Sequence, residues 1–156
     1  MSQRSICVFC GARSGKDPSY EATAIELGTL GAKMIVEAEY LYTNLGTHCL
    51  VANATQTAGG DTFGVIPEHL LKREVGKTDL SRFIVTENMH ERKKVMFMNC
   101  DAIVVLPGGA GSLDEFFEVM TWRQLYVAVK ILQNMKNSGY WDPLVGLLDH
   151  VINVLD

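Results

Sequence analysis

Residues 102–106 read AIVVL, five consecutive apolar residues, and the stretch PGGAGS follows directly. A run of this kind is typical of a strand that is buried on both faces. Such strands belong to parallel sheets whose two faces are covered by helices. The segment therefore favours a fold in which strands and helices alternate.

The rest of the chain shows this alternation from end to end. Further strands are predicted at 5–11, 40–44, 62–66 and 82–87, with a weaker one near 130–135. Helical patterns occupy the remaining segments, at 17–40, 47–58, 67–75, 88–100, 112–127 and 142–156. Asp17 and Asn88 are suited to cap two helices, and Gly59-Gly60 to end another. We predict an α/β fold, a three-layer parallel sheet with helices on both faces, in one domain spanning residues 1–156.

Composition excludes several classes of function. The 156 residues carry a net charge of −4, with 47% hydrophobic and 21% charged residues, which is ordinary for a globular protein. We therefore expect no nucleic-acid partner and no binding to an anionic membrane. No apolar run is long enough to span a bilayer, and residues 1–11 lack a secretory signal, so we expect a cytoplasmic protein.

Two features could suggest a metal site, and neither supports one. Cys7 and Cys10 form a C-x-x-C pair, but the pair falls inside a predicted strand. Residues three apart on a strand point to opposite faces, so we expect buried free thiols. His90 has no His, Cys or carboxylate neighbour at metal-ligand spacing. No metal site is predicted.

The segment PGGAGS lies between a predicted buried strand and a predicted helix. Gly108, Gly109 and Gly111 would let a ligand approach the main chain closely, and Ser112 adds a hydroxyl donor. The helix that follows presents free N–H groups and the positive end of its dipole. The pattern matches neither the Walker loop nor the G-x-G-x-x-G fingerprint. It favours a phosphate or similar anion, although a turn without a ligand stays possible.

Glu115 has two interpretations. The residues from Ser112 to Glu115 fit S-x-x-E, the capping box, in which the glutamate only accepts from the cap amide. Spacing alone favours that structural role. In the first turn beside a phosphate site, however, the carboxylate could also reach a sugar.

A basic segment opens the helix before the AIVVL strand. Met89, Arg92, Lys93 and Met96 share one face of this helix by their spacing. Arg92 and Lys93 have apolar neighbours there, so a role facing a cleft is plausible, whereas Lys94 fits a solvated face.

These residues together resemble a known family. MHERK at 89–93, followed after a strand by PGGAGSLDE at 107–115, is similar to the paired motif of the Lonely Guy proteins, with Ser112 in place of a threonine. The similarity extends to VFCGARSGKDPSY, GVIPEHLLKREV and GYWDPLVGLLDHV. Members are cytokinin-activating nucleoside 5′-monophosphate phosphoribohydrolases, also described as possible lysine decarboxylases.

The resemblance implies a Rossmann-like, doubly wound homodimer that hydrolyses the N-glycosidic bond of a purine riboside 5′-monophosphate. The products would be a free base and ribose 5-phosphate, with no metal or organic cofactor. It also implies that Glu115 and Arg92 form the catalytic pair. The residues implied to bind substrate are Glu74, Met89, Lys93, Gly108, Gly109, Ala110, Gly111 and Ser112.

The chain departs from the family at 40–49, YLYTNLGTHC. The family has a second glycine loop there, but only Tyr40 and Gly46 match it, and Leu41, Tyr42 and Thr43 stand where glycines are expected. The segment 126–138 also diverges, and the chain stops earlier than most members, which leaves open whether part of the last helix is missing.

Three explanations of these departures remain open: an active hydrolase with a remodelled pocket, a nucleotide-binding relative with weak or no catalysis, or a locally corrupted sequence. The competing functions are a hydrolase, a nucleotide or molybdenum-cofactor carrier of the same fold, and a scaffold without a ligand. The preferred base is not predicted.

Overall fold

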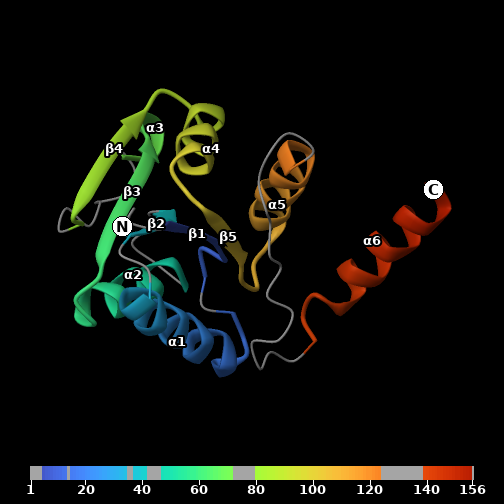
Figure 1. The fold of residues 1–156 in the computed structure, drawn as a ribbon, viewed down its shortest axis with the longest axis horizontal. Coiled ribbons are helices and arrows are strands. Elements are labelled where there is room, and N and C mark those ends of the chain that lie inside the picture. The colour runs from blue at the N-terminus through green and yellow to red at the C-terminus, as the bar shows by residue number, and fades with distance from the viewer. Residues whose placement is uncertain are drawn as a thin grey trace.

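The computed structural model describes residues 5–13, 15–34, 37–41, 47–71, 80–123 and 139–155. Strands and helices alternate along them (Figure 1). The strands are β1 (Ser5–Phe9), β2 (Glu37–Leu41), β3 (Asp61–Pro67), β4 (Arg82–Thr86) and β5 (Ala102–Val105). The helices are α1 (Pro18–Met34), α2 (Thr47–Thr57), α3 (Glu68–Leu71), α4 (Met89–Met98), α5 (Ala110–Arg123) and α6 (Asp142–Leu155).

The five described strands form one parallel sheet in the order β4-β3-β2-β1-β5. Strand β1 has a neighbour on each side, since Val8 is in register with Tyr40 of β2 and with Val104 of β5. The chain thus moves outward from β1 to β4 and then returns to the other side of β1. This reversal makes a topological switch point between β1 and β5, where open α/β sheets bind ligands.

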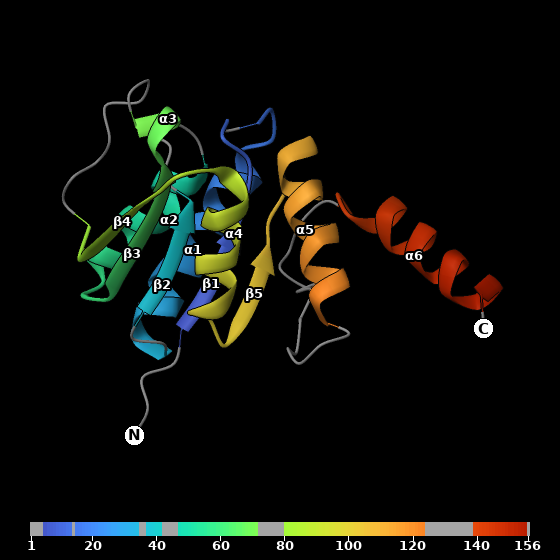
Figure 2. The ribbon, with the colours of Figure 1, turned by 90° about the horizontal axis from the view of Figure 1, so that it is seen from above.

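Each face of the sheet has its own apolar core. On one face, Val8 and Cys10 pack with residues of α1 and α2, including Leu27 and Val51. On the other face, Cys7, Phe9 and Ile103 pack with Met96 of α4, Phe116 of α5 and side chains of α6. Figures 1 and 2 show the sheet between these two groups of helices. The predicted three-layer parallel α/β fold is confirmed.

The cysteine prediction is confirmed as well. Cys7 and Cys10 belong to cores on opposite faces, and both are buried and form no disulfide.

Three predicted helix ends are also confirmed. The Asp17 carboxylate accepts a hydrogen bond from the Ser19 N–H at 2.9 Å, at the start of α1. The Asn88 side chain accepts from the Glu91 N–H at 2.9 Å and caps α4. Gly59 has a φ of 82° after α2, a left-handed conformation that glycine adopts without strain.

The boundary between α1 and β2 differs from the prediction. The helical pattern continues to Tyr40, but α1 ends at Met34 and β2 occupies 37–41 instead of 40–44. Residues 37–41 form strand because β1 and β3 pair with them on both sides, and such pairing overrides a local helical preference. The predicted strand near 130–135 and the divergent segment 126–138 lie outside the described residues, as do residues 42–46 of the divergent segment 40–49.

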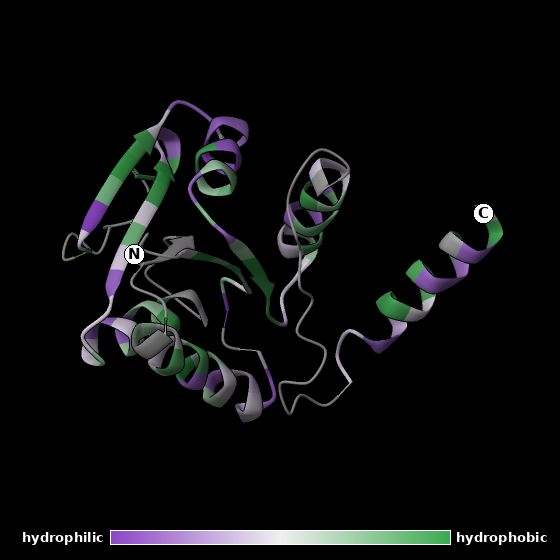
Figure 3. Cartoon of the chain, viewed as in Figure 1, coloured by the Kyte–Doolittle hydropathy of each residue, from purple (hydrophilic) through white to green (hydrophobic). Residues whose placement is uncertain are grey.

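Helix α6 extends from the body of the molecule (Figures 1 and 2). Leu144 and Leu148 pack against the core beside α5. Leu147, Val151 and Val154 are exposed, and Figure 3 shows hydrophobic residues recurring along the helix. No helix within the described ranges is both long and apolar enough to cross a membrane.

Candidate active site

The loops that follow β1 and β5 are held together at the switch point. The Leu106 N–H donates to the Phe9 carbonyl at 2.8 Å, and the Gly11 N–H donates to the Pro107 carbonyl at 3.1 Å. These bonds continue the pairing of the two strands into their loops. The two loops at the carboxyl edge of the sheet are therefore held in a fixed position relative to each other.

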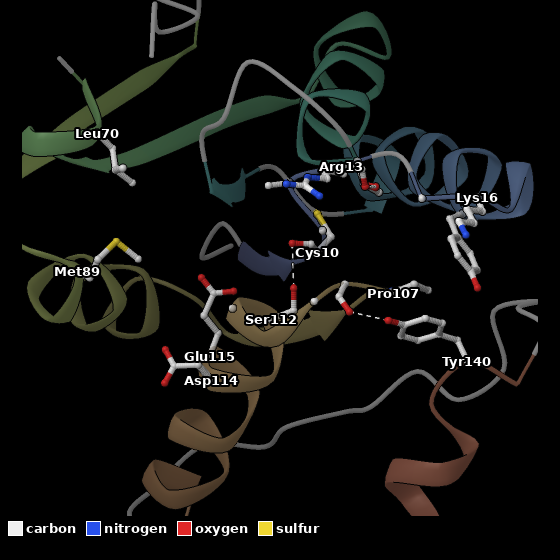
Figure 4. A pocket seen from close by; sticks show the side chains of 18 of the residues that line it. Cys10, Arg13, Lys16, Leu70, Met89, Pro107, Ser112, Asp114, Glu115 and Tyr140 are labelled. Carbon is white, nitrogen blue, oxygen red and sulfur yellow. Dashed lines mark hydrogen bonds between the residues drawn. The ribbon is translucent and has the colours of Figure 1, made fainter. Parts of the chain in front are cut away.

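A cavity of about 720 Å³ opens above these loops (Figure 4). Its volume lies in the range of sites for small organic ligands. Its walls come from the loop after β1, the starts of α1 and α2, α3, α4, the loop after β5, α5 and Tyr140, two residues before α6. The lining residues are Cys10, Gly11, Ala12, Arg13, Gly15, Lys16, Tyr20, Thr47, Leu70, Met89, Arg92, Pro107, Gly108, Gly109, Gly111, Ser112, Asp114, Glu115 and Tyr140.

The N-terminus of α5 faces the cavity, and it begins two residues before its predicted start. The Gly109 carbonyl already accepts a helical hydrogen bond, with an N···O distance of 3.2 Å. Gly109 is thus the N-cap, and Ser112 is the third residue of the helix. The Ser112 hydroxyl donates to the Cys10 carbonyl at 3.0 Å (Figure 4). The capping-box interpretation is therefore wrong, and Glu115 lies beyond the first turn.

The glycines of this loop have two roles: Gly108 lets segments of the chain pack closely, and Gly109 and Gly111 leave space open. A β-carbon on Gly108 would lie 2.1 Å from the Ser112 hydroxyl oxygen and 3.0 Å from the Gly11 nitrogen. Around the corresponding positions on Gly109 and Gly111, no described atom lies within 4 Å. The helix N–H groups beside these two glycines are consequently accessible from the cavity. Such a helix N-terminus binds phosphates and carboxylates.

Arg92 is a buried cation at the edge of the cavity. Its side chain is 1% exposed, and its Nε donates to the Val65 carbonyl of β3 at 3.0 Å. Nη1 contacts the sulfur of Met89 at 3.6 Å, and Nη2 lies 4.0 Å from Oε1 of Glu115. A buried guanidinium needs a nearby negative charge to offset its lost hydration. Glu115 of the neighbouring helix supplies that charge when its carboxyl is ionised.

Glu115 is 4% exposed and opens onto the cavity (Figure 4). Burial raises the pKa of its carboxyl from 4.5 to about 7, although Arg92 and Lys93 both act to lower it. Burial and the charge of Glu115 also raise the pKa of the adjacent Cys10 thiol. The thiol is therefore protonated near neutral pH, whereas the Glu115 carboxyl can both accept and donate a proton there.

Lys93 lies beside the cavity, and it is not among the lining residues. Its ammonium donates to Asp114 of α5 at 2.9 Å and also pairs with Glu118 of the same helix. Burial by itself would lower the pKa of Lys93. The hydrogen bonds to Glu118 and Asp114 raise this pKa by more than burial lowers it, so the net change is upward. His90 is largely exposed and pairs with Glu118 at 3.4 Å.

The structure brings most of the expected site residues together around one cavity. Arg92, Glu115, Met89 and the loop residues 108, 109, 111 and 112 all line it. Lys93 and Ala110 do not line it, and Glu74 lies outside the described residues. Within the described ranges, no three His, Cys, Asp or Glu side chains gather as metal ligands.

Several lining residues were not expected from the sequence. Arg13, Lys16 and Tyr20 come from the loop after β1 and the start of α1, and Tyr140 donates from its hydroxyl to the Gly108 carbonyl at 2.6 Å. A signal was available for the first group, because the loop after β1 leaves the sheet at the same edge as PGGAGS. No local pattern indicates Tyr140, which comes from a segment 32 residues beyond its partner.

The sheet order and the ligand-sized cavity at the switch point, which the N-terminus of α5 faces, define a Rossmann-like α/β protein. Solved structures share the fold. A molybdenum cofactor carrier protein from Chlamydomonas reinhardtii superposes with a TM-score of 0.69 at 20% identity, over 82% of this chain and 75% of that one. A molybdenum cofactor binding protein from Rippkaea orientalis gives 0.65 at 20% identity, over 97% and 99%.

Sequence comparison goes further than the fold. The family model described as possible lysine decarboxylase matches residues 49–154. A cytokinin riboside 5′-monophosphate phosphoribohydrolase of Arabidopsis thaliana is 36% identical over 150 residues, covering 96% of this chain and 69% of that protein. One from Oryza sativa subsp. japonica is 35% identical, covering 96% and 62%. The chain belongs to the possible lysine decarboxylase family, within its Lonely Guy proteins, and it spans about two thirds of the length of these relatives.

Proposed function

We propose that this protein hydrolyses the N-glycosidic bond of a purine riboside 5′-monophosphate and releases the free base and ribose 5-phosphate. The relatives whose names state this activity on cytokinin ribosides support the reaction class. The proposed substrate is a mononucleotide, because one cavity presents an anion site and a buried carboxylate side by side.

The observation that carries the proposal is the state of Glu115. A carboxyl that is 4% exposed and has a pKa of about 7 lies on the cavity wall, beyond the first turn of α5. A structural cap has no need of such an environment. Perturbed acids in clefts of this kind are typical of acid–base catalysts.

We assign the phosphate to the N-terminus of α5, where Gly109, Gly111 and Ser112 line the cavity. Binding there would place the sugar toward the following turn, which carries Glu115. Breaking the bond between C1′ and the base nitrogen builds positive charge on the sugar, which an ionised carboxylate stabilises. The same carboxylate can accept a proton from the attacking water, whose oxygen bonds to C1′, and then give that proton to the leaving base nitrogen, so that one water is added across the broken bond.

Arg92 and Met89 have separate proposed roles. The Arg92 guanidinium is a fixed donor whose position is set by Val65 and which we expect to bind a ribose oxygen or the phosphate. Met89 and Leu70 form an apolar part of the wall, shown on one side of Glu115 in Figure 4. That part suits the planar face of a purine better than a charged group.

The test is base release from AMP and from isopentenyladenosine monophosphate, followed by chromatography. Glu115→Gln removes the ionisable group at constant shape, and we expect base release to fall by roughly 10²–10⁴-fold. Glu26→Gln, an exposed glutamate on α1, is the matched control and should keep full activity.

Other outcomes identify the competing functions. A folded wild-type protein that binds AMP and releases no base would be a nucleotide carrier, and the hydrolase proposal would be wrong. The two solved carrier structures share only the fold at 20% identity, so they do not favour this outcome. A scaffold predicts no AMP binding at all, which the lined cavity with its buried Glu115 argues against.

We further propose that the protein is a cytoplasmic homodimer. The four cysteines, all of which the structure describes, form no disulfide, which fits a reducing compartment. The exposed face of α6, formed by Leu147, Val151 and Val154, is a suitable apolar surface for a second copy.

A further inference from the structure

Lys93 connects the two helices that carry the proposed catalytic pair. Its ammonium contacts Asp114 and Glu118, which are four residues apart on α5 and therefore share one face of that helix. The Lys93 side chain is 13% exposed and that of Glu118 is 18% exposed, so this contact is shielded from solvent. Shielded ion pairs of this kind are screened less by salt than surface pairs are.

The residues next to this contact in the sequence are the ones that face the cavity. Arg92 precedes Lys93 on α4, and Glu115 follows Asp114 on α5. Because each pair is adjacent on a rigid helix, the contact of Lys93 with α5 constrains the separation of Arg92 and Glu115. That separation is 4.0 Å between Nη2 and Oε1.

Aromatic packing between the helices does not constrain this region in the same way. The Trp122 ring of α5 makes T-shaped contacts with Phe97 and His90 of α4, at centroid distances of 4.8 and 6.4 Å. Trp122 lies two turns beyond Glu115 along α5. Three side chains of α4 make polar contacts with α5 in the described part of this region: His90 with Glu118, Arg92 with Glu115, and Lys93 with both Asp114 and Glu118.

We propose that Lys93 is a positioning residue for the hydrolysis, which acts by clamping α5 to α4 so that Arg92 faces Glu115, and that it does not bind substrate. This inference rests on the proposed function for its kinetic consequences only. Two carboxylates already occupy the Lys93 ammonium, and the residue is absent from the cavity lining.

The clamp also has an electrostatic consequence for Glu115. The charged groups around Glu115 are Arg92 and Lys93 on α4 and Asp114 and Glu118 on α5, and the Cys10 thiol lies at the end of β1. Arg92 and Lys93 lower the pKa of Glu115, whereas Asp114 and Glu118 raise it. Replacing Lys93 removes one positive charge near Glu115 and leaves the carboxylates of Asp114 and Glu118 without that partner. The pKa of Glu115 should therefore rise.

The experiment compares Lys93→Met, Lys93→Arg and the control Lys94→Met, which removes an exposed charge from the same helix. We expect Lys93→Met to lower kcat for AMP at pH 7 by roughly tenfold to a hundredfold, because a small misplacement of reacting groups is costly. KM should change less than about twofold, since no substrate contact is lost. The acid limb of the pH profile should move to higher pH, and Lys93→Arg should restore most of kcat.

Two further measurements make the result decisive. Adding Glu118→Gln to Lys93→Met should cause little additional loss, because both changes break the same contact. The Glu115 carboxyl can be titrated directly by ¹³C NMR in the wild type, Lys93→Met and Lys93→Arg. We expect a higher pKa in the methionine variant alone.

A severalfold rise in KM at unchanged kcat, with an unmoved Glu115 titration, would make Lys93 a substrate ligand and overturn the inference. If the wild type releases no base, the proposed function is wrong, and the titration alone then decides the clamp. An equal Glu115 pKa in wild type and Lys93→Met would refute it. Should Lys93→Met fail to fold, Glu118→Gln weakens the same contact from α5 and should lower kcat with little change in KM, while the pKa of Glu115 should fall because a carboxylate that raises it is lost. An unchanged kcat in Glu118→Gln would then refute the clamp.

Discussion

Arg92 and Glu115 are buried together, and their two charges respond differently to burial. An arginine keeps its proton at any pH relevant to a cell, so the carboxyl must adapt. The pKa of Glu115 rises because the loss of hydration outweighs the attraction of Arg92 and Lys93. The residue is thereby a less stable anion than an exposed glutamate and a more effective proton acceptor near neutral pH.

This adaptation predicts a pH-dependent cost in stability. The pKa of Glu115 is about 7 in the folded protein and about 4.5 when the chain is unfolded, so below pH 4.5 the group is neutral in both states. Between pH 4.5 and 7 the unfolded chain ionises this carboxyl while the folded protein keeps it protonated, so the folded protein loses about 3 kcal/mol of stability over that range and no more above it. Glu115→Gln cannot ionise, so its unfolding free energy relative to wild type should increase by about that amount between pH 4.5 and 8.

Urea denaturation of both proteins at several pH values measures this difference, and all other titrating groups cancel in the comparison. Glu26→Gln, whose carboxylate is exposed, should show no such trend. A constant difference between Glu115→Gln and wild type over this pH range would show that Glu115 has an ordinary pKa.

At the scale of elements, the loop between β5 and α5 has two kinds of glycine. A β-carbon on Gly108 would lie 2.1 Å from the Ser112 hydroxyl oxygen, whereas one on Gly111 would meet no described atom within 4 Å. Gly108→Ala should therefore destabilise the protein by about 1–3 kcal/mol, because the neighbouring loop must move. Gly111→Ala lies within α5 and should be neutral or slightly stabilising, as alanine favours helix.

The effects of these two substitutions on substrate binding should have the opposite order to their effects on stability. Gly111 lines the cavity, so its methyl group should raise KM for AMP in a protein of normal stability. Thermal unfolding and steady-state kinetics on the two variants separate these effects. Equal destabilisation by both substitutions would contradict the close contact at Gly108.

A helix end could be predicted from the sequence where the interaction that sets it is local along the chain. Asn88 and Asp17 cap their helices through residues two or three positions away, so a short pattern predicts them. The start of α5 has no such local cause. Ser112 looks like a cap in sequence, but its hydroxyl bonds to the Cys10 carbonyl, 102 residues away, and the helix begins earlier.

At the scale of the whole molecule, α6 presents one apolar side to the core and another to solvent. Leu147 is 54% exposed and Val154 is 67% exposed. If this surface holds a homodimer, the wild type should have twice the monomer mass in light scattering, and Leu147→Glu with Val151→Glu should yield monomers. Leu30→Glu, at an exposed apolar position on α1, should remain a dimer. A monomeric wild type at micromolar concentration would refute the proposed dimer.

The two core clusters show why the layer arrangement was predictable. Each strand alternates its side chains between faces, so Cys7 and Cys10 could be assigned to opposite layers before their partners were known. The order of the strands was not predictable in this way. Strand β2 forms from a segment with a helical pattern because β1 and β3 lie on both sides of it.

The α/β alternation, the helix caps and the candidate pair Arg92 and Glu115 could be predicted from the amino-acid sequence, because each depends on a local pattern or on a recognisable motif. The folded chain was needed to show that Glu115 is no helix cap, that Lys93 pairs with α5 beside the cavity, and that Arg13 and Tyr140 line the cavity walls. These outcomes depend on burial and on contacts between segments distant in sequence. Such contacts arise where separate strands end at one edge of the sheet, and no short pattern encodes them.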